Sequence, residues 1–105
     1  MAGQIFETAV VSEVVKSLWH SHTEPRVHFW RTATGQEVDL LIETAQGLVP
    51  VEIKASATLR QEMRGGIDHL RRDLGHTVRH GYVVFAGSDA VPLGPHVSAL
   101  AFSQL

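Results

Sequence analysis

The sequence predicts a single α/β domain over residues 1–105. Apolar residues at helical spacing come first, three short strand-like segments separated by turn residues follow, and a second helical stripe precedes further apolar strands. Elements that alternate in this way pack helices against a sheet, so we expect a mixed sheet flanked by helices. Trp19, Phe29 and Trp30 are expected to anchor its core.

The first helix is expected over residues 5–20, because apolar residues recur there at steps of four, at Phe6, Val10, Val14 and Leu18. Residues 22–25 interrupt this pattern. The segments 27–32 and 37–44 are predicted to be strands, and residues 33–36 between them have turn chemistry. We expect these two strands to form an antiparallel hairpin.

A third strand is expected over residues 48–54, after a tight turn at Gly47. Pro50 has no amide hydrogen to donate, which favours an irregular or edge position for this strand. Two more strands are predicted near the end of the chain, over residues 81–86 and 97–102.

The second helix is expected to begin at Thr58, because Thr58 and Gln61 have the spacing of a capping box. Its apolar stripe continues to about residue 74, through Leu59, Met63, Ile67, Leu70 and Leu74. Gly65 and Gly66 would then lie in mid-helix, where they either permit close packing or mark a kink.

Charge and composition narrow the function classes. Nine Lys and Arg against eleven Asp and Glu argue against a broad nucleic-acid footprint, so any such contact must come from a local patch. The absence of cysteine excludes disulfides and thiolate zinc sites, and oxygen ligands would favour magnesium or manganese. No apolar run approaches the ~20 residues of a membrane span, so we expect a cytoplasmic protein without membrane contact.

Acidic residues and a lysine on neighbouring strands form the candidate site. Strand alternation puts Glu52 and Lys54 on one face, and it puts Asp39 opposite Val38 and Leu40 on the preceding strand. If the strands pair around the turn, Asp39 and Glu52 converge, and two carboxylates ~4 Å apart repel by about 4 kcal/mol at an effective dielectric of 20. Lys54 and a divalent cation would relieve that repulsion. Alternatively, these are solvated charges on the outer face of an exposed hairpin.

Glu7 falls within the apolar arc of the first helix when its residues are plotted at 100° per residue. A carboxylate in an apolar face is costly unless it is paired or bound to metal. We therefore expect Glu7 to reach the same site as Asp39 and Glu52. Alternatively, Glu7 satisfies free amides in the first helical turn.

On the second helix, Arg60, Arg64 and Arg71 are predicted to border the apolar stripe as a basic ridge. Such a ridge could hold nucleic-acid phosphates and would be the local patch that the net charge requires. The alternative is a solvated face whose arginines pair in part with Asp68.

Taken together, Glu7, the run GQEVD at residues 35–39 and the run EIK at residues 52–54 resemble the PD-(D/E)XK nuclease superfamily. The expected element order matches the restriction-endonuclease-like αβββαβ core of that superfamily. More closely, GQIFET, FWRT, GQEVD and VEIKAS resemble the domain of unknown function that closes many prokaryotic AAA-type ATPase proteins. This resemblance spans residues 3–87.

The resemblance implies a divalent-metal-dependent DNA endonuclease that hydrolyses phosphodiesters. Asp39 and Glu52 would bind Mg²⁺ or Mn²⁺, Lys54 would be the catalytic lysine, and Glu7 would be an accessory acid. Val38 stands where the superfamily motif has proline.

The alternative is a non-catalytic DNA-binding or protein-interaction module of an AAA-type ATPase, which pairs with an ATPase domain or with a second copy of itself. The chain has no Gly-rich loop ending in Gly-Lys-Ser/Thr, so we expect no ATPase activity of its own. It is therefore expected to be a stand-alone domain or one excised from a longer protein.

Overall fold

The computed structural model describes residues 3–21, 24 and 26–105, so most of the expected break at residues 22–25 lies outside the described residues. Its helices and strands are α1 (Gly3–His20), β1 (Val27–Arg31), β2 (Glu37–Thr44), β3 (Gly47–Lys54), α2 (Gly65–Leu74), β4 (Gly81–Phe85), β5 (Val91–Gly94) and β6 (Val97–Ala101). Three short 3₁₀ turns accompany them, η1 (Gln61–Arg64), η2 (Gly75–Thr77) and η3 (Phe102–Gln104). The αβββαβ order is confirmed, and β5 is an additional strand.

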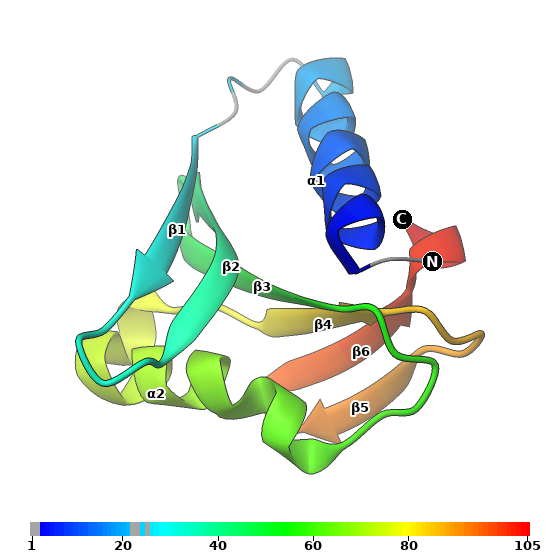
Figure 1. Cartoon of the computed structure of the whole chain (residues 1–105). Helices are drawn as coiled ribbons and strands as arrows, with labels where there is room; N and C mark the ends of the chain where they lie inside the picture. Colours follow the sequence, from blue (N-terminus) through cyan, green and yellow to red (C-terminus); the bar gives the residue numbers. More distant parts are fainter. Residues whose placement is uncertain (1–2, 22–23, 25) are drawn as a thin grey trace.

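The six strands form one mixed sheet in the order β1-β2-β3-β4-β6-β5. β1, β2 and β3 pair antiparallel, β3, β4 and β6 pair parallel, and β5 returns antiparallel along β6. Helices α1 and α2 lie on opposite faces of this sheet (Figure 1). The predicted α/β class, with a mixed sheet flanked by helices, is therefore confirmed.

Each face of the sheet has its own apolar core. Ile67 and Leu70 of α2 pack on one face with Val83, and Phe6 and Val10 of α1 pack on the other face. Strand β4 contributes to both cores, which is why it is an uninterrupted apolar run. Among the described residues, no helix is long and apolar enough to cross a membrane.

Helix α1 covers its face of the sheet only in part. Phe6 and Val10 are its buried residues, whereas Ile5 and Trp19 are each 61% exposed. On β1, Phe29 is also exposed, at 69%. The expectation that Trp19 and Phe29 anchor the core is therefore wrong, because they point away from both cores. Trp30 is half-buried against the α2-side core, as expected.

Pro50 is buried in β3, which pairs on both sides, so of the two expected positions the edge is wrong and the irregular one is confirmed. The proline is tolerated because the regular ladder to β4 begins one residue later, at Val51. A single bridge from Leu48 to Val78 precedes that ladder. The missing amide of Pro50 therefore coincides with the gap in the pairing with β4, and the Arg79 carbonyl accepts a bond from Arg71 instead.

The second helix starts later than its capping box predicts. Arg60 has extended backbone, residues 61–64 form η1, and α2 begins at Gly65. Gly66 therefore lies in the first turn of α2, where a β-carbon would come within 1.9 Å of the Glu37 carbonyl oxygen. Close packing, and not a kink, is the reason for glycine at this position. This contact fixes the start of α2 against β2.

Candidate active site

A β-bulge in β2 sets the position of Asp39. In the β1–β2 ladder His28 pairs with Leu41 and Trp30 pairs with Val38, so two residues of β2 lie opposite Phe29. A bulge of this kind reverses the alternation of side chains along the strand. Accordingly, Val38 and Leu41 both face the α2-side core. The expected strict alternation along β2 is wrong at this point, and Asp39 lies within the bulge.

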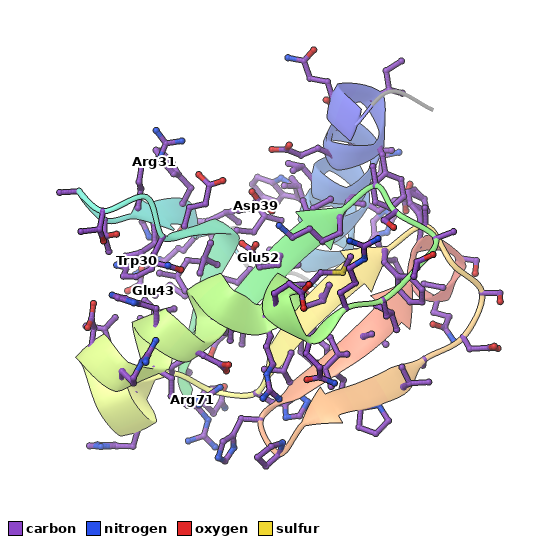
Figure 2. All side chains as sticks on the ribbon, turned by 60° about the horizontal axis from the view of Figure 1, so that its bottom comes forward. Trp30, Arg31, Asp39, Glu43, Glu52 and Arg71 are labelled. Carbon is purple, nitrogen blue, oxygen red and sulfur yellow. The ribbon has the colours of Figure 1, made fainter. Side chains whose placement is uncertain are left out.

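Beyond the bulge, the carboxylates of Asp39 and Glu52 bridge β2 and β3. The β2–β3 ladder begins at the Leu40–Val51 pair, so Asp39 lies just outside it. The Asp39 backbone N–H donates to Glu52 Oε1 at 2.9 Å, and the Ile53 backbone N–H donates to Asp39 Oδ2 at 2.7 Å. The predicted convergence of Asp39 and Glu52 is confirmed, and it occurs through reciprocal side-chain to backbone bonds (Figure 2).

Lys54 completes a three-residue site with these carboxylates. Val51 and Ile53 face the α1-side core, so Glu52 and Lys54 point to the α2 side of the sheet. Glu52 is only 3% exposed, and its Oε2 lies 3.4 Å from Lys54 Nζ, whose side chain is partly open to solvent. The alternative of solvated charges on an outer face is therefore wrong for Glu52.

Burial makes both carboxylates reluctant to ionise. Burial raises the pKa of Glu52 to about 7, and the charge of Asp39 adds to this, while Lys54 and the Asp39 amide oppose it. The pKa of Asp39 is also raised, chiefly by burial, against the opposing effects of the Ile53 amide and Lys54. Two desolvated carboxylates that repel each other gain stability when a cation comes between them.

The donor set suits a hydrated divalent cation. Each carboxylate commits one oxygen to a backbone amide. The second oxygens are Asp39 Oδ1 and Glu52 Oε2, and the latter also faces Lys54 Nζ. Magnesium is usually held by one or two carboxylates and keeps several waters. Within the described ranges, no group of three or more His, Cys, Asp or Glu could enclose a metal ion. The two oxygens therefore fit Mg²⁺ or Mn²⁺ better than a metal that needs a complete protein cage.

Glu7 does not join these residues. It is exposed, and among the described residues it makes no hydrogen bond or ion pair. Helix α1 packs on the α1-side core, whereas Glu52 and Lys54 point to the other side. The premise that Glu7 is buried in an apolar face is wrong, because α1 meets the sheet through the narrow strip of Phe6 and Val10. Its accessory role stays a prediction.

The three arginines of the predicted ridge do not share a helix face. Arg60 lies in extended backbone before η1. Arg64 donates to the Leu93 carbonyl and pairs with Asp68 at 3.2 Å. Arg71 donates to three backbone carbonyls. The ridge geometry is therefore wrong, since the helix begins after Arg60 and the other two guanidinium groups hold the fold together. Their contact with nucleic acid stays a prediction.

Sequence reasoning missed the backbone part of this site. The amides of Asp39 and Ile53 hold the two carboxylates, yet their availability depends on the bulge, and no glycine or proline marks the bulge in the sequence. In the sequence, the spacing of Asp39, Glu52 and Lys54 was the only signal of this site.

No curated protein and no solved structure matches the chain. A family model, described as a domain of unknown function (DUF4143), matches residues 2–105. The match covers almost the entire sequence, so this chain belongs to the DUF4143 family.

Proposed function

We propose that this domain is a divalent-metal-dependent DNA endonuclease of the PD-(D/E)XK type, with Asp39, Glu52 and Lys54 as its catalytic residues. The observation that carries the proposal is the pair of hydrogen bonds by which the carboxylates of Asp39 and Glu52 join β2 to β3 beyond the end of their ladder. Lys54 Nζ lies 3.4 Å from the Glu52 carboxylate. Structural charges rarely combine this degree of burial with mutual repulsion, whereas perturbed carboxylates cluster at functional sites.

Each residue has a distinct part in the proposed reaction. Asp39 Oδ1 and Glu52 Oε2 would hold Mg²⁺ or Mn²⁺, and the backbone amides fix the opposite oxygens so that the carboxylates cannot turn away. The ion supplies positive charge that polarises a phosphodiester and acidifies an attacking water. Lys54 Nζ lies 3.4 Å from Glu52 Oε2 and can donate a hydrogen bond to a phosphate oxygen.

Glu7 enters this proposal only as an accessory acid from α1. The family resemblance implies that role, while the exposed side chain has no contact that supports it. Replacing Glu7 with Gln is therefore expected to lower cleavage much less than replacing Asp39 or Glu52. If Glu7→Gln lowers the cleavage rate as much as those substitutions do, Glu7 belongs to the site together with Asp39 and Glu52.

Cleavage of duplex DNA tests the proposal directly. Supercoiled plasmid is incubated with the protein and with Mg²⁺ or Mn²⁺ at a concentration of about 5 to 10 mM. Asp39→Asn and Lys54→Met are expected to lower the rate at least ~100-fold, the scale on which single electrostatic contacts act in catalysis. Glu43→Gln is the matched control, because Glu43 is also a β2 carboxylate but pairs with His28, outside the site.

The outcome that rejects nuclease activity is equally definite. Cleavage that persists unchanged in Asp39→Asn and Lys54→Met would show that a contaminant is responsible. Absence of cleavage by folded parent protein, across plasmid, single-stranded and branched DNA, would leave the domain without the proposed chemistry.

We also propose a second candidate, a non-catalytic interaction module of an AAA-type ATPase. It is favoured by the exposed apolar residues of α1, since Ile5 and Trp19 are fourteen positions apart and thus lie on nearly the same side of the helix. A partner domain or a second copy would cover this side. Sedimentation at increasing concentration tests for self-association, and Trp19→Glu should abolish it if this face is used.

A further inference from the structure

Cationic side chains gather at the end of the molecule where α2 finishes and β4 and β6 begin. We call this surface the cationic pole, and it consists of Arg72, His76, Arg79, His80 and His96. All five side chains are exposed. Residues 71–80 carry three arginines and one aspartate, in a chain whose formal net charge is −2. Three of the nine Lys and Arg residues therefore lie within ten consecutive positions.

Arg71 links the two chain segments that carry most of the pole. Its guanidinium donates to the Val78 carbonyl at 2.7 Å, the Arg79 carbonyl at 2.8 Å and the His96 carbonyl at 3.4 Å. These carbonyls come from two separate segments, the one before β4 and the one before β6. Figure 2 shows Arg71 at one end of α2, away from Glu52. Arg71 thus positions the surface, because both terminal nitrogens of its guanidinium donate to backbone carbonyls and its Nε is buried.

The charges of the pole are largely free. Among the described residues, the arginines without an ion pair are Arg26, Arg60, Arg71, Arg72 and Arg79, and the last two belong to the pole. Asp73 is the carboxylate within this stretch, and it lies 3.6 Å from His69. Arg26 lines a hollow with two carboxylates, Glu24 and Glu43. Arg72 lines a hollow with Asp68, whose carboxylate already pairs with Arg64 at 3.2 Å. The pole therefore presents two arginines, Arg72 and Arg79, that make no ion pair among the described residues, which suits a polyanion.

The pole lies within reach of a substrate bound at the carboxylate site. Lys54 pairs with Phe85 at the end of β4, and Arg79 precedes the start of β4 by two residues. At ~3.3 Å per residue the separation along this strand is about 20 Å. A duplex advances ~3.4 Å per base pair, so this distance corresponds to roughly six base pairs.

We infer that the cationic pole is a contact surface for the DNA backbone, which it grips roughly six base pairs from the bond that is cleaved. This inference rests on the proposed function. Arginine forks and histidines are suited to phosphate oxygens and carry no sequence information, so the pole positions DNA without selecting its sequence.

The test measures binding without cleavage. A fluorescein-labelled 20-base-pair duplex is titrated in EDTA, by anisotropy, at several salt concentrations. The variant Arg72→Gln/Arg79→Gln removes two charges from the pole. The matched control Lys16→Gln/Arg26→Gln removes two charges from α1 and from the segment before β1, so both proteins have the same net charge.

Each lost phosphate contact lowers the slope of log K against log salt by ~0.9, so the pole variant is expected to lose about 2 from that slope and at least tenfold in affinity at low salt. The control should keep the parent slope. The inference is overturned if both variants weaken binding equally, if the pole variant binds like the parent, or if the parent binds no DNA.

Failure of this inference differs from failure of the proposed function. If DNA binding depends on the pole but the protein never cleaves DNA, the contact surface is supported and the proposed nuclease function is contradicted. Cleavage that is abolished by Asp39→Asn, but is unchanged in rate and in KM by Arg72→Gln/Arg79→Gln, would sustain the nuclease and reject the surface.

Discussion

Asp39 donates its backbone N–H to the side chain of Glu52, at 2.9 Å, where a regular sheet would have a carbonyl acceptor. The carboxylate of Asp39 in turn accepts the amide of Ile53. Two residues proposed for catalysis therefore also close the gap between β2 and β3. Because a buried donor without its acceptor costs free energy, changes at this site affect stability as well as activity.

The first prediction concerns pH. Burial raises the pKa of Glu52 from 4.5 to about 7, so the folded protein holds this proton more tightly than the unfolded chain does. The free energy of unfolding of metal-free protein should thus fall as pH rises from about 4.5 to about 7, by up to ~3 kcal/mol. Urea unfolding at pH 5 and at pH 7.5 measures the difference. Glu52→Gln cannot titrate and should show a much smaller fall, whereas parallel profiles would contradict the assignment.

The second prediction concerns metal binding. Mg²⁺ or Mn²⁺ should raise the melting temperature more at pH 8 than at pH 6, because the metal competes with the proton on Glu52. At an ion concentration 100 times Kd the gain is about 2.7 kcal/mol. Asp39→Asn should lose this stabilisation and Glu43→Gln should retain it. Equal stabilisation of both variants would place the ion elsewhere.

The third prediction uses two adjacent glycines. Gly66→Ala would push a β-carbon against the Glu37 carbonyl, a backbone atom that cannot move away, and should cost about 3 kcal/mol. Gly65→Ala is the control, because the nearest atom would be 4.0 Å away and φ is already helical, at −55°. It should be neutral or stabilise by up to ~1 kcal/mol. Chemical unfolding of both variants decides, and a similar loss in each would argue against the contact.

The fourth prediction concerns Arg71. Lysine at this position keeps the charge but cannot reach three carbonyls from a planar group, so Arg71→Lys should lower the free energy of unfolding by ~1–3 kcal/mol. Arg72→Lys, on the neighbouring exposed residue, should stay within ~0.5 kcal/mol of the parent. If both substitutions are tolerated, the carbonyl contacts contribute little to stability.

Much of the fold follows from local patterns. The helical spacing at the start, the two turns between the first strands and the apolar run of β4 each reflect one local preference, so the αβββαβ order could be predicted. The convergence of Asp39 with Glu52 followed from the same hairpin. Strand β5 was missed because Pro92, Gly94 and Pro95 are typical of loops, and only pairing with β6 makes this segment a strand.

The remaining errors come from tertiary contacts. For Pro50, an edge and an irregular position both stayed open, because the sequence does not reveal a gap in the neighbouring ladder. Glu7 was placed in the site because a helical wheel does not show how much of α1 the sheet covers. Arg60 was placed on a helix face because η1 and the Gly66 contact delay the start of α2.

The bulge in β2 also gives the molecule an internal reporter. The amide protons of Asp39 and Ile53 are covered by carboxylate oxygens, whereas ladder amides are covered by carbonyls. Their exchange with deuterated solvent should therefore depend on whether those carboxylates are protonated, ionised or bound to a cation. Two resonances in an NMR spectrum would then follow the chemistry of the site directly, in protein without label, substrate or substitution.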